Sequence, residues 1–91
     1  MIGENLLNIS KINDARFKVV TDKHTYIYIT LDRYNSTTNI KYFPDMIYPG
    51  EITEIKDDGN EFIIITDSGK NVIELAMYSF GYGYFMLVDL F

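Results

Sequence analysis

The sequence predicts an all-β domain of six to seven antiparallel strands, arranged as a small barrel or a tight sandwich. Short runs of β-branched and aromatic residues recur along the chain, and turn sequences separate them. The clearest turns are Asp58-Gly59 and Asp67-Ser68-Gly69, because Asp bonds to its own nearby backbone and Gly reaches positive φ without a Cβ clash. Residues 25–31 alternate Ile or Leu with Tyr or Thr, which is the period of a strand with two different faces.

The first third of the chain is expected to supply three strands. Apolar residues at helical spacing make a short N-terminal helix over residues 1–7 an alternative to an extended start. From Ile9 onward the pattern is extended. Residues 16–21 (RFKVVT) are the second expected strand, and residues 25–31 (TYIYITL) are the third.

The two faces of the third strand differ in character. We expect Ile27, Ile29 and Leu31 to face the core, which places Tyr26 and Tyr28 on the outer face. Exposed Tyr side chains are typical of contact surfaces, since the ring offers apolar area and the hydroxyl a polar group. The alternative is that a second layer, such as an N-terminal helix or the following long segment, covers both rings.

Residues 32–49 (DRYNSTTNIKYFPDMIYP) interrupt the strand pattern. They contain both prolines of the chain and little periodicity. Connections this long are uncommon inside a compact domain, and they are often functional or contain a short element. We expect a short strand over residues 40–43 and a single helical turn, opened by Pro44, over residues 44–48.

The second half of the chain continues as strands. Residues 50–75 contain three strands around the two Asp-Gly-type turns, and residues 61–66 are apolar on both faces, as expected of a central strand covered on both sides. Residues 76–83 form an aromatic corner. The last strand, residues 84–91, is apolar on both faces apart from Asp89, so it must be covered by barrel closure or across a homodimer.

The chain contains a candidate internal repeat. Each copy has the pattern I-x-x-I, a turn containing Asp, F-x-[VI]-[VI]-T-D, a turn and a third strand. A repeat predicts two three-stranded meanders joined by residues 32–49 and completed by the C-terminal strand. The alternative is hairpin chemistry shared by chance in an Ile-rich chain. The alignment sets Ile9–Ile12 over Ile52–Ile55, Phe17–Asp22 over Phe62–Asp67, and Ile27 over Val72.

Length and charge limit the class of function. Residues 1–91 are expected to form one small β domain. Eight basic and thirteen acidic residues give a net charge of −5, which argues against a nucleic-acid partner because phosphates are bound by clustered Lys and Arg. The carboxylates between Glu51 and Glu61 fit a solvated hairpin face better than a mimic of nucleic acid. No secretory signal is visible and no apolar run approaches the ~20 residues of a membrane helix, so we expect a cytoplasmic protein with no membrane partner.

A catalytic or metal site is not expected. The chain has no Cys and one His, His24, which fits an ordinary turn residue better than a general base or a metal ligand. The G-x-S-x-G nucleophile motif is absent, and Gly81-Tyr82-Gly83 lacks the third Gly and the helix of a dinucleotide site. We therefore predict a protein that is not an enzyme and that uses no metal or cofactor.

The candidate binding residues are aromatic, with one added cation. Aromatic side chains in loops and corners line ligand pockets or anchor protein partners, and the alternative is that they fill the ends of a small barrel. Arg33 is included because it stands beside Tyr34 where the long segment begins. The predicted contact residues are Tyr26, Tyr28, Arg33, Tyr34, Tyr42, Phe43, Tyr48, Tyr78 and Tyr82.

These observations favour a non-catalytic protein-binding or self-associating module that acts through a Tyr-rich surface. The high content of Ile, Asn, Lys, Tyr and Phe indicates AT-rich coding, as in many low-GC bacteria and their phages. A compact acidic β scaffold with many aromatic residues and no catalytic set then suggests a small inhibitor encoded by a phage or another mobile element. The alternative function is binding or sequestering of a small, nucleotide-like ligand. A nucleic-acid mimic and an enzyme rank below both.

Overall fold

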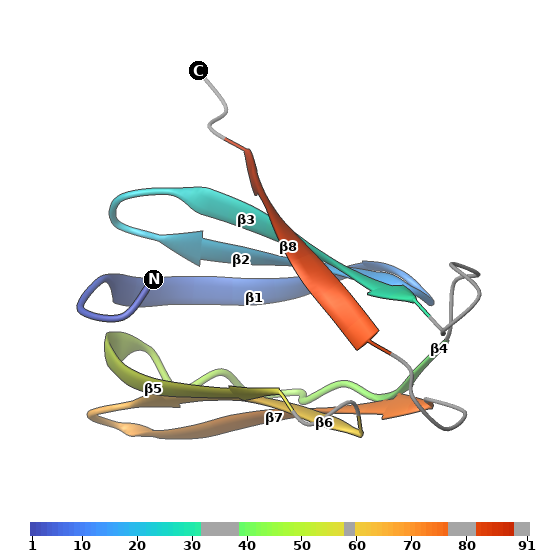
Figure 1. Cartoon of the computed structure of the whole chain (residues 1–91). Coiled ribbons are helices and arrows are strands. Elements are labelled where there is room, and N and C mark those ends of the chain that lie inside the picture. Colours follow the sequence, from blue (N-terminus) through green and yellow to red (C-terminus); the bar gives the residue numbers. More distant parts are fainter. Residues whose placement is uncertain (32–38, 58–59, 77–81, 89–91) are drawn as a thin grey trace.

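The computed structural model describes residues 1–31, 39–57, 60–76 and 82–88, which contain eight strands and no helix (Figure 1). No helix in these segments is therefore long and apolar enough to cross a membrane. The strands are β1 (Asn5–Asn13), β2 (Arg16–Thr21), β3 (Thr25–Leu31), β4 (Asn39–Tyr42), β5 (Gly50–Asp57), β6 (Glu61–Thr66), β7 (Gly69–Ala76) and β8 (Tyr82–Val88).

All strand pairs are antiparallel, and the strands follow one order, β4-β7-β6-β5-β1-β2-β3-β8. Figure 1 shows two facing layers, with β1, β2 and β3 in one and β5, β6 and β7 in the other. Among the described residues the two layers share one strand pairing, the joint between β1 and β5, which consists of two residue pairs, Asn5 with Glu51 and Leu6 with Gly50. Within the described segments β4 and β8 are open ends of the order, so the sheet is not closed into a barrel. The all-β prediction is confirmed, in a sandwich-like arrangement.

Of the two alternatives for the N-terminus, the extended start is confirmed and the short helix is wrong. The chain makes a tight turn, in which the Glu4 amide donates to the Met1 carbonyl at 3.0 Å and Gly3 has a φ of 87°, and β1 then begins at Asn5. The helix-like spacing of the apolar residues has another cause. A β-bulge after Leu6 shifts the register by one residue, so Leu6 and Ile9 are both buried on one face of a strand.

The predicted repeat is present as two meanders, β1-β2-β3 and β5-β6-β7, and the strand order is the same read from either end. The sequence alignment is correct from Phe17 and Phe62 onward, since Phe17 lies opposite Tyr28 and Phe62 lies opposite Ile73. By the same count, Ile27 corresponds to Val72 as predicted. The two halves are therefore related by an approximate two-fold axis through the β1–β5 joint.

The predicted alignment of the first strands is wrong by three residues. Bulges follow Leu6 in β1 and Ile52 in β5, and each of these residues lies opposite the last residue of the next strand. Leu6 and Ile9 therefore match Ile52 and Ile55, whereas Ile12 is 48% exposed. The error arose because the I-x-x-I pattern of Ile52 and Ile55 is repeated at Ile9 and Ile12, whereas the residues that match in the structure, Leu6 and Ile9, begin with a leucine.

The repeated Thr-Asp sequence closes the second turn of each meander. The side-chain oxygen of Thr21 accepts the Lys23 amide at 3.2 Å, and that of Thr66 accepts the Ser68 amide at the same distance. Both threonines are buried, with 5% of their surface exposed. This local hydrogen bond satisfies the buried hydroxyl and fixes the turn, which explains why the same two residue types stand at both positions.

The core lies between the two layers and is aromatic at its centre. The Tyr28 ring is 1% exposed, its centroid lies 4.8 Å from the Phe17 and Phe62 centroids, and its hydroxyl donates to Asp57 Oδ2 at 2.6 Å. Burial first, and then the hydrogen bond and the negative charge of Asp57, raise the pKa of the Tyr28 hydroxyl. Tyr28 therefore ties the first meander to β5 of the second.

The predicted orientation of β3 is wrong. Tyr26 and Tyr28 point inward, because they lie opposite the buried Val19 and Phe17 of β2. Ile29, on the other face, is also buried, at 7% exposure. Period-two alternation shows that two faces exist, but with large apolar residues on both it does not show which one faces the core.

The outer face of β6 is less covered than predicted. Phe62 and Ile64 are buried in the core, while Ile63 and Ile65 on the opposite face are half-buried. Figure 1 shows the second layer, made of β5, β6 and β7, with its other side facing away from the first layer. The central strand is thus covered fully on one side only.

Candidate binding site

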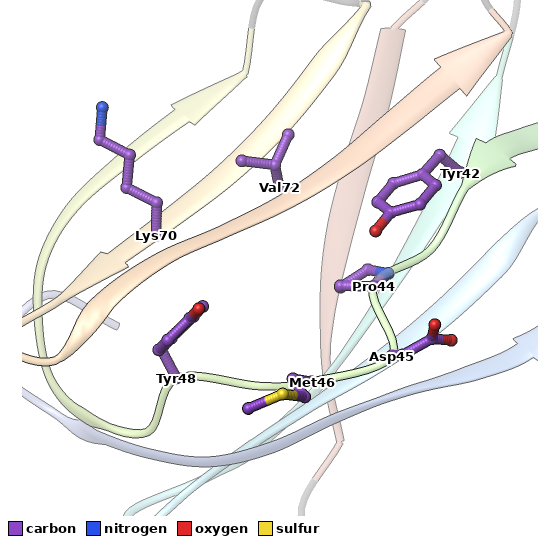
Figure 2. Close-up of a pocket in the computed structure, with 7 residues that line it drawn as sticks. All are labelled: Tyr42, Pro44, Asp45, Met46, Tyr48, Lys70 and Val72. Atoms are coloured by element: carbon purple, nitrogen blue, oxygen red, sulfur yellow. The ribbon is translucent and has the colours of Figure 1, made fainter.

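A pocket of about 330 Å³ lies beside β7, between that strand and the segment that follows β4. In Figure 2, Lys70 and Val72 project from β7, Tyr42 comes from the end of β4, and the remaining side chains come from the segment that follows β4. Its lining residues are Tyr42, Pro44, Asp45, Met46, Tyr48, Lys70 and Val72.

The pocket exists because the chain leaves the sheet early. Strand β4 pairs with β7 only as far as Tyr42, which lies opposite Glu74. Two residues later Pro44 has no amide hydrogen with which to continue the ladder. The predicted short strand is present, but the predicted turn over residues 44–48 is wrong, since this segment has no helical hydrogen bonding.

Three large apolar side chains are exposed around the pocket. Met46 is 70% exposed, Tyr42 is 51% exposed and Tyr48 is 43% exposed. Single exposed apolar residues are ordinary on a protein surface, whereas a group of them around one hollow is typical of an interaction site. The charged groups of Asp45 and Lys70 border the same pocket, so its apolar centre has a polar rim.

The buried side-chain amide of Asn71 holds Tyr48, which forms one wall of the pocket (the Tyr48 wall), in place. The Asn71 side chain is 1% exposed, its Oδ1 accepts the Tyr48 amide at 2.7 Å, and its Nδ2 donates to the carbonyls of Tyr48 at 3.0 Å and Ile64 at 3.2 Å. The Thr66 hydroxyl adds a hydrogen bond to the Tyr48 carbonyl at 3.1 Å. The irregular segment is therefore fixed to β6 and β7 through side chains.

The Tyr48 ring lies directly on the backbone of β7. A Cβ atom at Gly69 would be 2.8 Å from Tyr48 Cγ, which is closer than real Cβ contacts. Gly69 thus permits an approach that any other residue would block. This contact holds one part of the Tyr48 side chain, which also lines the pocket and remains 43% exposed.

The predicted site residues do not form a single surface. Tyr42 and Tyr48 meet at the pocket, and Phe43 is half-buried, with its ring centroid 6.3 Å from that of Phe17. Tyr26 and Tyr28 point into the protein, so the exposed Tyr26/Tyr28 contact face is absent. Arg33, Tyr34 and Tyr78 lie outside the described residues, and so does the side chain of Tyr82 in β8.

Sequence reasoning missed Met46, Lys70, Val72 and Asn71. Met46 lies in the same short segment as Pro44 and Tyr48, and its position between two prolines was a usable signal. The three β7 residues were not foreseeable from sequence spacing, because they join the pocket through strand pairing.

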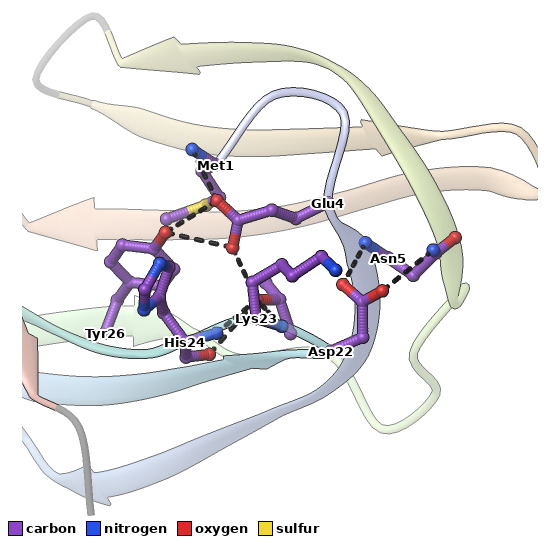
Figure 3. Close-up of polar contacts among 8 residues, drawn as sticks. Met1, Glu4, Asn5, Asp22, Lys23, His24 and Tyr26 are labelled. Atoms are coloured by element: carbon purple, nitrogen blue, oxygen red, sulfur yellow. Dashed lines mark hydrogen bonds and ion pairs between the residues drawn. The ribbon is translucent and has the colours of Figure 1, made fainter.

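A second group of polar side chains surrounds Glu4 (Figure 3). Its carboxylate accepts hydrogen bonds from the Thr21 hydroxyl at 2.6 Å and the Tyr26 hydroxyl at 2.8 Å, and it lies 3.0 Å from the Met1 ammonium. Burial opposes ionisation of Glu4, but the hydrogen bonds from Thr21, the ammonium group and Tyr26 outweigh it and lower its pKa to about 2. The Glu4 carboxylate therefore has a structural role, since its oxygens already accept hydrogen bonds from several donors.

Replacing Glu4 by glutamine is expected to flatten the acid dependence of stability. The folded-state pKa of Glu4 is depressed, so its stabilisation is fully present above about pH 4.5 and is lost as the pH falls through about 2. We expect this group to contribute about 2 kcal/mol to the pH-dependent change, less than the full shift because Glu4 is partly solvated. Urea denaturation of wild type and Glu4→Gln between pH 2 and 6 measures it.

Glu51→Gln, at an exposed carboxylate on β5, controls for the loss of one negative charge. An unchanged acid dependence in Glu4→Gln, identical to that of wild type, would assign the acid sensitivity to other carboxylates.

A smaller pocket of about 260 Å³ contains two carboxylates. Glu61 and Glu74 lie directly opposite each other on β6 and β7, and Lys41 lines the same hollow together with Asn60 and Leu75. All three charged residues are exposed. The hollow is therefore lined by a group of exposed surface charges, two carboxylates and one ammonium group.

In the part of the chain that the structure describes, no three potential ligands lie together in a way that could hold a metal ion. Of the two pockets described above, the one bordered by Tyr42 and Tyr48 (the Tyr42–Tyr48 pocket) has mainly apolar walls. No protein-family model, curated protein or solved structure matches this chain.

Proposed function

We propose that this chain is a non-catalytic protein-binding module and that it contacts its partner through the Tyr42–Tyr48 pocket. The observation that carries the proposal is the group of three exposed apolar side chains around a hollow whose backbone is fixed by the buried Asn71. The role of an inhibitor encoded by a phage or mobile element and the cytoplasmic location stay predictions from the sequence.

The shape of the pocket favours a protein over a small molecule. Small-ligand sites typically enclose most of the ligand surface and measure about 300–1,000 Å³. This pocket is at the small end of that range, and Met46 and Tyr42 remain more than half exposed around it. A flat partner surface or a chain segment can cover these side chains, whereas an isolated small molecule would remain largely in water.

The rigid Tyr48 wall favours tight binding of a protein partner. Ordering loops and side chains on association costs free energy, which a pre-ordered site avoids. Tyr48 is already held by Asn71, Thr66 and the contact with Gly69. Tyr and Met are enriched in the centres of protein interfaces, while charged groups such as Asp45 and Lys70 are typical of the rim.

The double substitution Tyr42→Ser and Met46→Ser is expected to weaken partner binding by at least about tenfold. Both side chains are exposed, so folding should be retained. The partner is identified by affinity purification and mass spectrometry, and its affinity for the purified variants is then measured by calorimetry.

The matched control is Leu7→Ser with Ile12→Ser, which removes two exposed apolar side chains from β1 instead (58% and 48% exposed). Normal binding by the control variant, together with loss in the pocket variant, is the expected result. The reverse pattern would place the contact surface on β1 and refute the proposed site.

A further inference from the structure

The two halves of the molecule differ in how their outer strands are covered. Strand β3 pairs with β8 over seven residue pairs, from Thr25 with Val88 to Leu31 with Tyr82. The equivalent strand β7 pairs with β4 over three residue pairs, which end at Glu74. Because Tyr28 corresponds to Ile73, residues 70–73 of β7 match residues 25–28 of β3, which β8 covers.

The uncovered backbone of β7 faces the pocket. In antiparallel strands, successive residues direct their amide and carbonyl groups to opposite edges. The Leu75 amide donates to the Asn60 carbonyl at 2.7 Å, toward β6, so Ile73 and Asn71 also face β6 and the intervening residues face the other way. Lys70 and Val72 therefore direct their backbone groups toward the pocket that they line. Among the described residues no strand pairs with them on that side.

The chain's own strands show what kind of strand fits along the uncovered edge of β7. Strand β4 runs antiparallel to β7 and would continue along it if the chain did not leave at Pro44. In the other half, the same position is filled by β8 residues 85–88, which have the apolar sequence Phe-Met-Leu-Val. Tyr42, Met46 and Tyr48 stand beside the vacant length of edge and can pack on the side chains of an added strand.

We infer that the partner supplies an extended, apolar segment that pairs antiparallel with residues 70–73 of β7, as β8 pairs with β3. The inference rests on the proposed function, because it specifies how the same pocket is occupied. Strand addition of this kind obtains affinity from backbone hydrogen bonds and specificity from alternate side chains. The occupant is a segment of a different protein, since the chain's own apolar strand β8 is already paired with β3.

The test uses a synthetic peptide with the β8 sequence Tyr-Gly-Tyr-Phe-Met-Leu-Val, extended by lysines for solubility, and the intact protein. Binding should slow hydrogen exchange at the Lys70 and Val72 amides by at least about tenfold at saturation. Two further peptides are N-methylated at every second residue, one on the odd-numbered and the other on the even-numbered positions. Only one of them should lose binding, because alternate amides point to opposite edges of an added strand.

Val72→Pro provides the matching change in the protein. It removes an amide that does not face β6, so the β6–β7 ladder keeps its hydrogen bonds, and Pro is tolerated at such edge positions. We expect it to abolish peptide binding, while Val72→Ala, which retains the amide, weakens binding only slightly. Circular dichroism checks that Val72→Pro is folded, and the N-methylated peptides test the same point without changing the protein.

Three outcomes would overturn strand addition: no peptide binding at millimolar concentration, equal binding by both N-methylated peptides, or binding without protection of Lys70 and Val72. If Tyr42→Ser with Met46→Ser still loses its partner in these cases, the proposed function stands and only the strand pairing fails. Light scattering that shows a dimer of wild type, but a monomer of Val72→Pro, would overturn the assignment to a different protein.

Discussion

Replacing Tyr28 by alanine is expected to lower the free energy of unfolding by about 3–5 kcal/mol. The ring is fully buried, it packs on both Phe17 and Phe62, and the cavity left by its removal would lie between the two layers. A domain of this size is stable by only about 5–10 kcal/mol, so the variant should be partly unfolded near physiological temperature. Urea and thermal denaturation followed by circular dichroism measure the loss.

The matched variant Tyr28→Phe separates the ring from the hydroxyl. Phenylalanine keeps the aromatic packing and removes only the 2.6 Å hydrogen bond to Asp57, so we expect a loss of about 1–3 kcal/mol. If Tyr28→Ala were as stable as Tyr28→Phe, packing of the Tyr28 ring would not contribute to the stability of the core.

Replacing Asn71 by leucine is expected to cost about 2–4 kcal/mol of stability and also to weaken partner binding. Leucine has the same number and branching of side-chain heavy atoms, but it is bulkier and leaves the Tyr48 amide and carbonyl without the partners that Asn71 provides. The Tyr48 wall should then become disordered while the sheet remains. Denaturation gives the stability change, and calorimetry at a temperature where the variant is folded gives the change in affinity.

Asn8→Leu is the control for this substitution, since Asn8 is an exposed strand residue of the same type. We expect its stability to change by less than about 0.5 kcal/mol and its affinity to stay the same. If Asn71→Leu lost stability but bound its partner normally, the fixed Tyr48 wall would have no part in binding.

Local chemistry explains which parts of the fold were predictable. The turn at Asp67-Ser68-Gly69 and the hairpin around it depend on residues adjacent in sequence, and the structure confirms them. The second half of the repeat pattern was predictable for the same reason, because Thr66 and Thr21 bond within their own turns. The sequence left an N-terminal helix open as an alternative because a bulge can place two apolar residues at helical spacing on one face of a strand.

The candidate site was only half predictable. Aromatic residues in a long proline-containing segment indicated Tyr42 and Tyr48, and both line the pocket. Asn71 and Val72 reach the same place only because β6 and β7 pair in one particular register, which is a long-range property. The inward orientation of Tyr28 was hidden in a similar way, since Phe62 from the other layer makes that face the better buried one.

The narrow β1–β5 joint has a consequence for the order of folding. Within each meander the hairpins close short stretches of chain, whereas the joint brings residues 5 and 51 together. Closing a longer loop costs more entropy and must be rewarded by contacts that form at the same time. Two residue pairs offer little such reward, so we expect the joint to close late, together with the docking of the two apolar faces around Tyr28, Phe17 and Phe62.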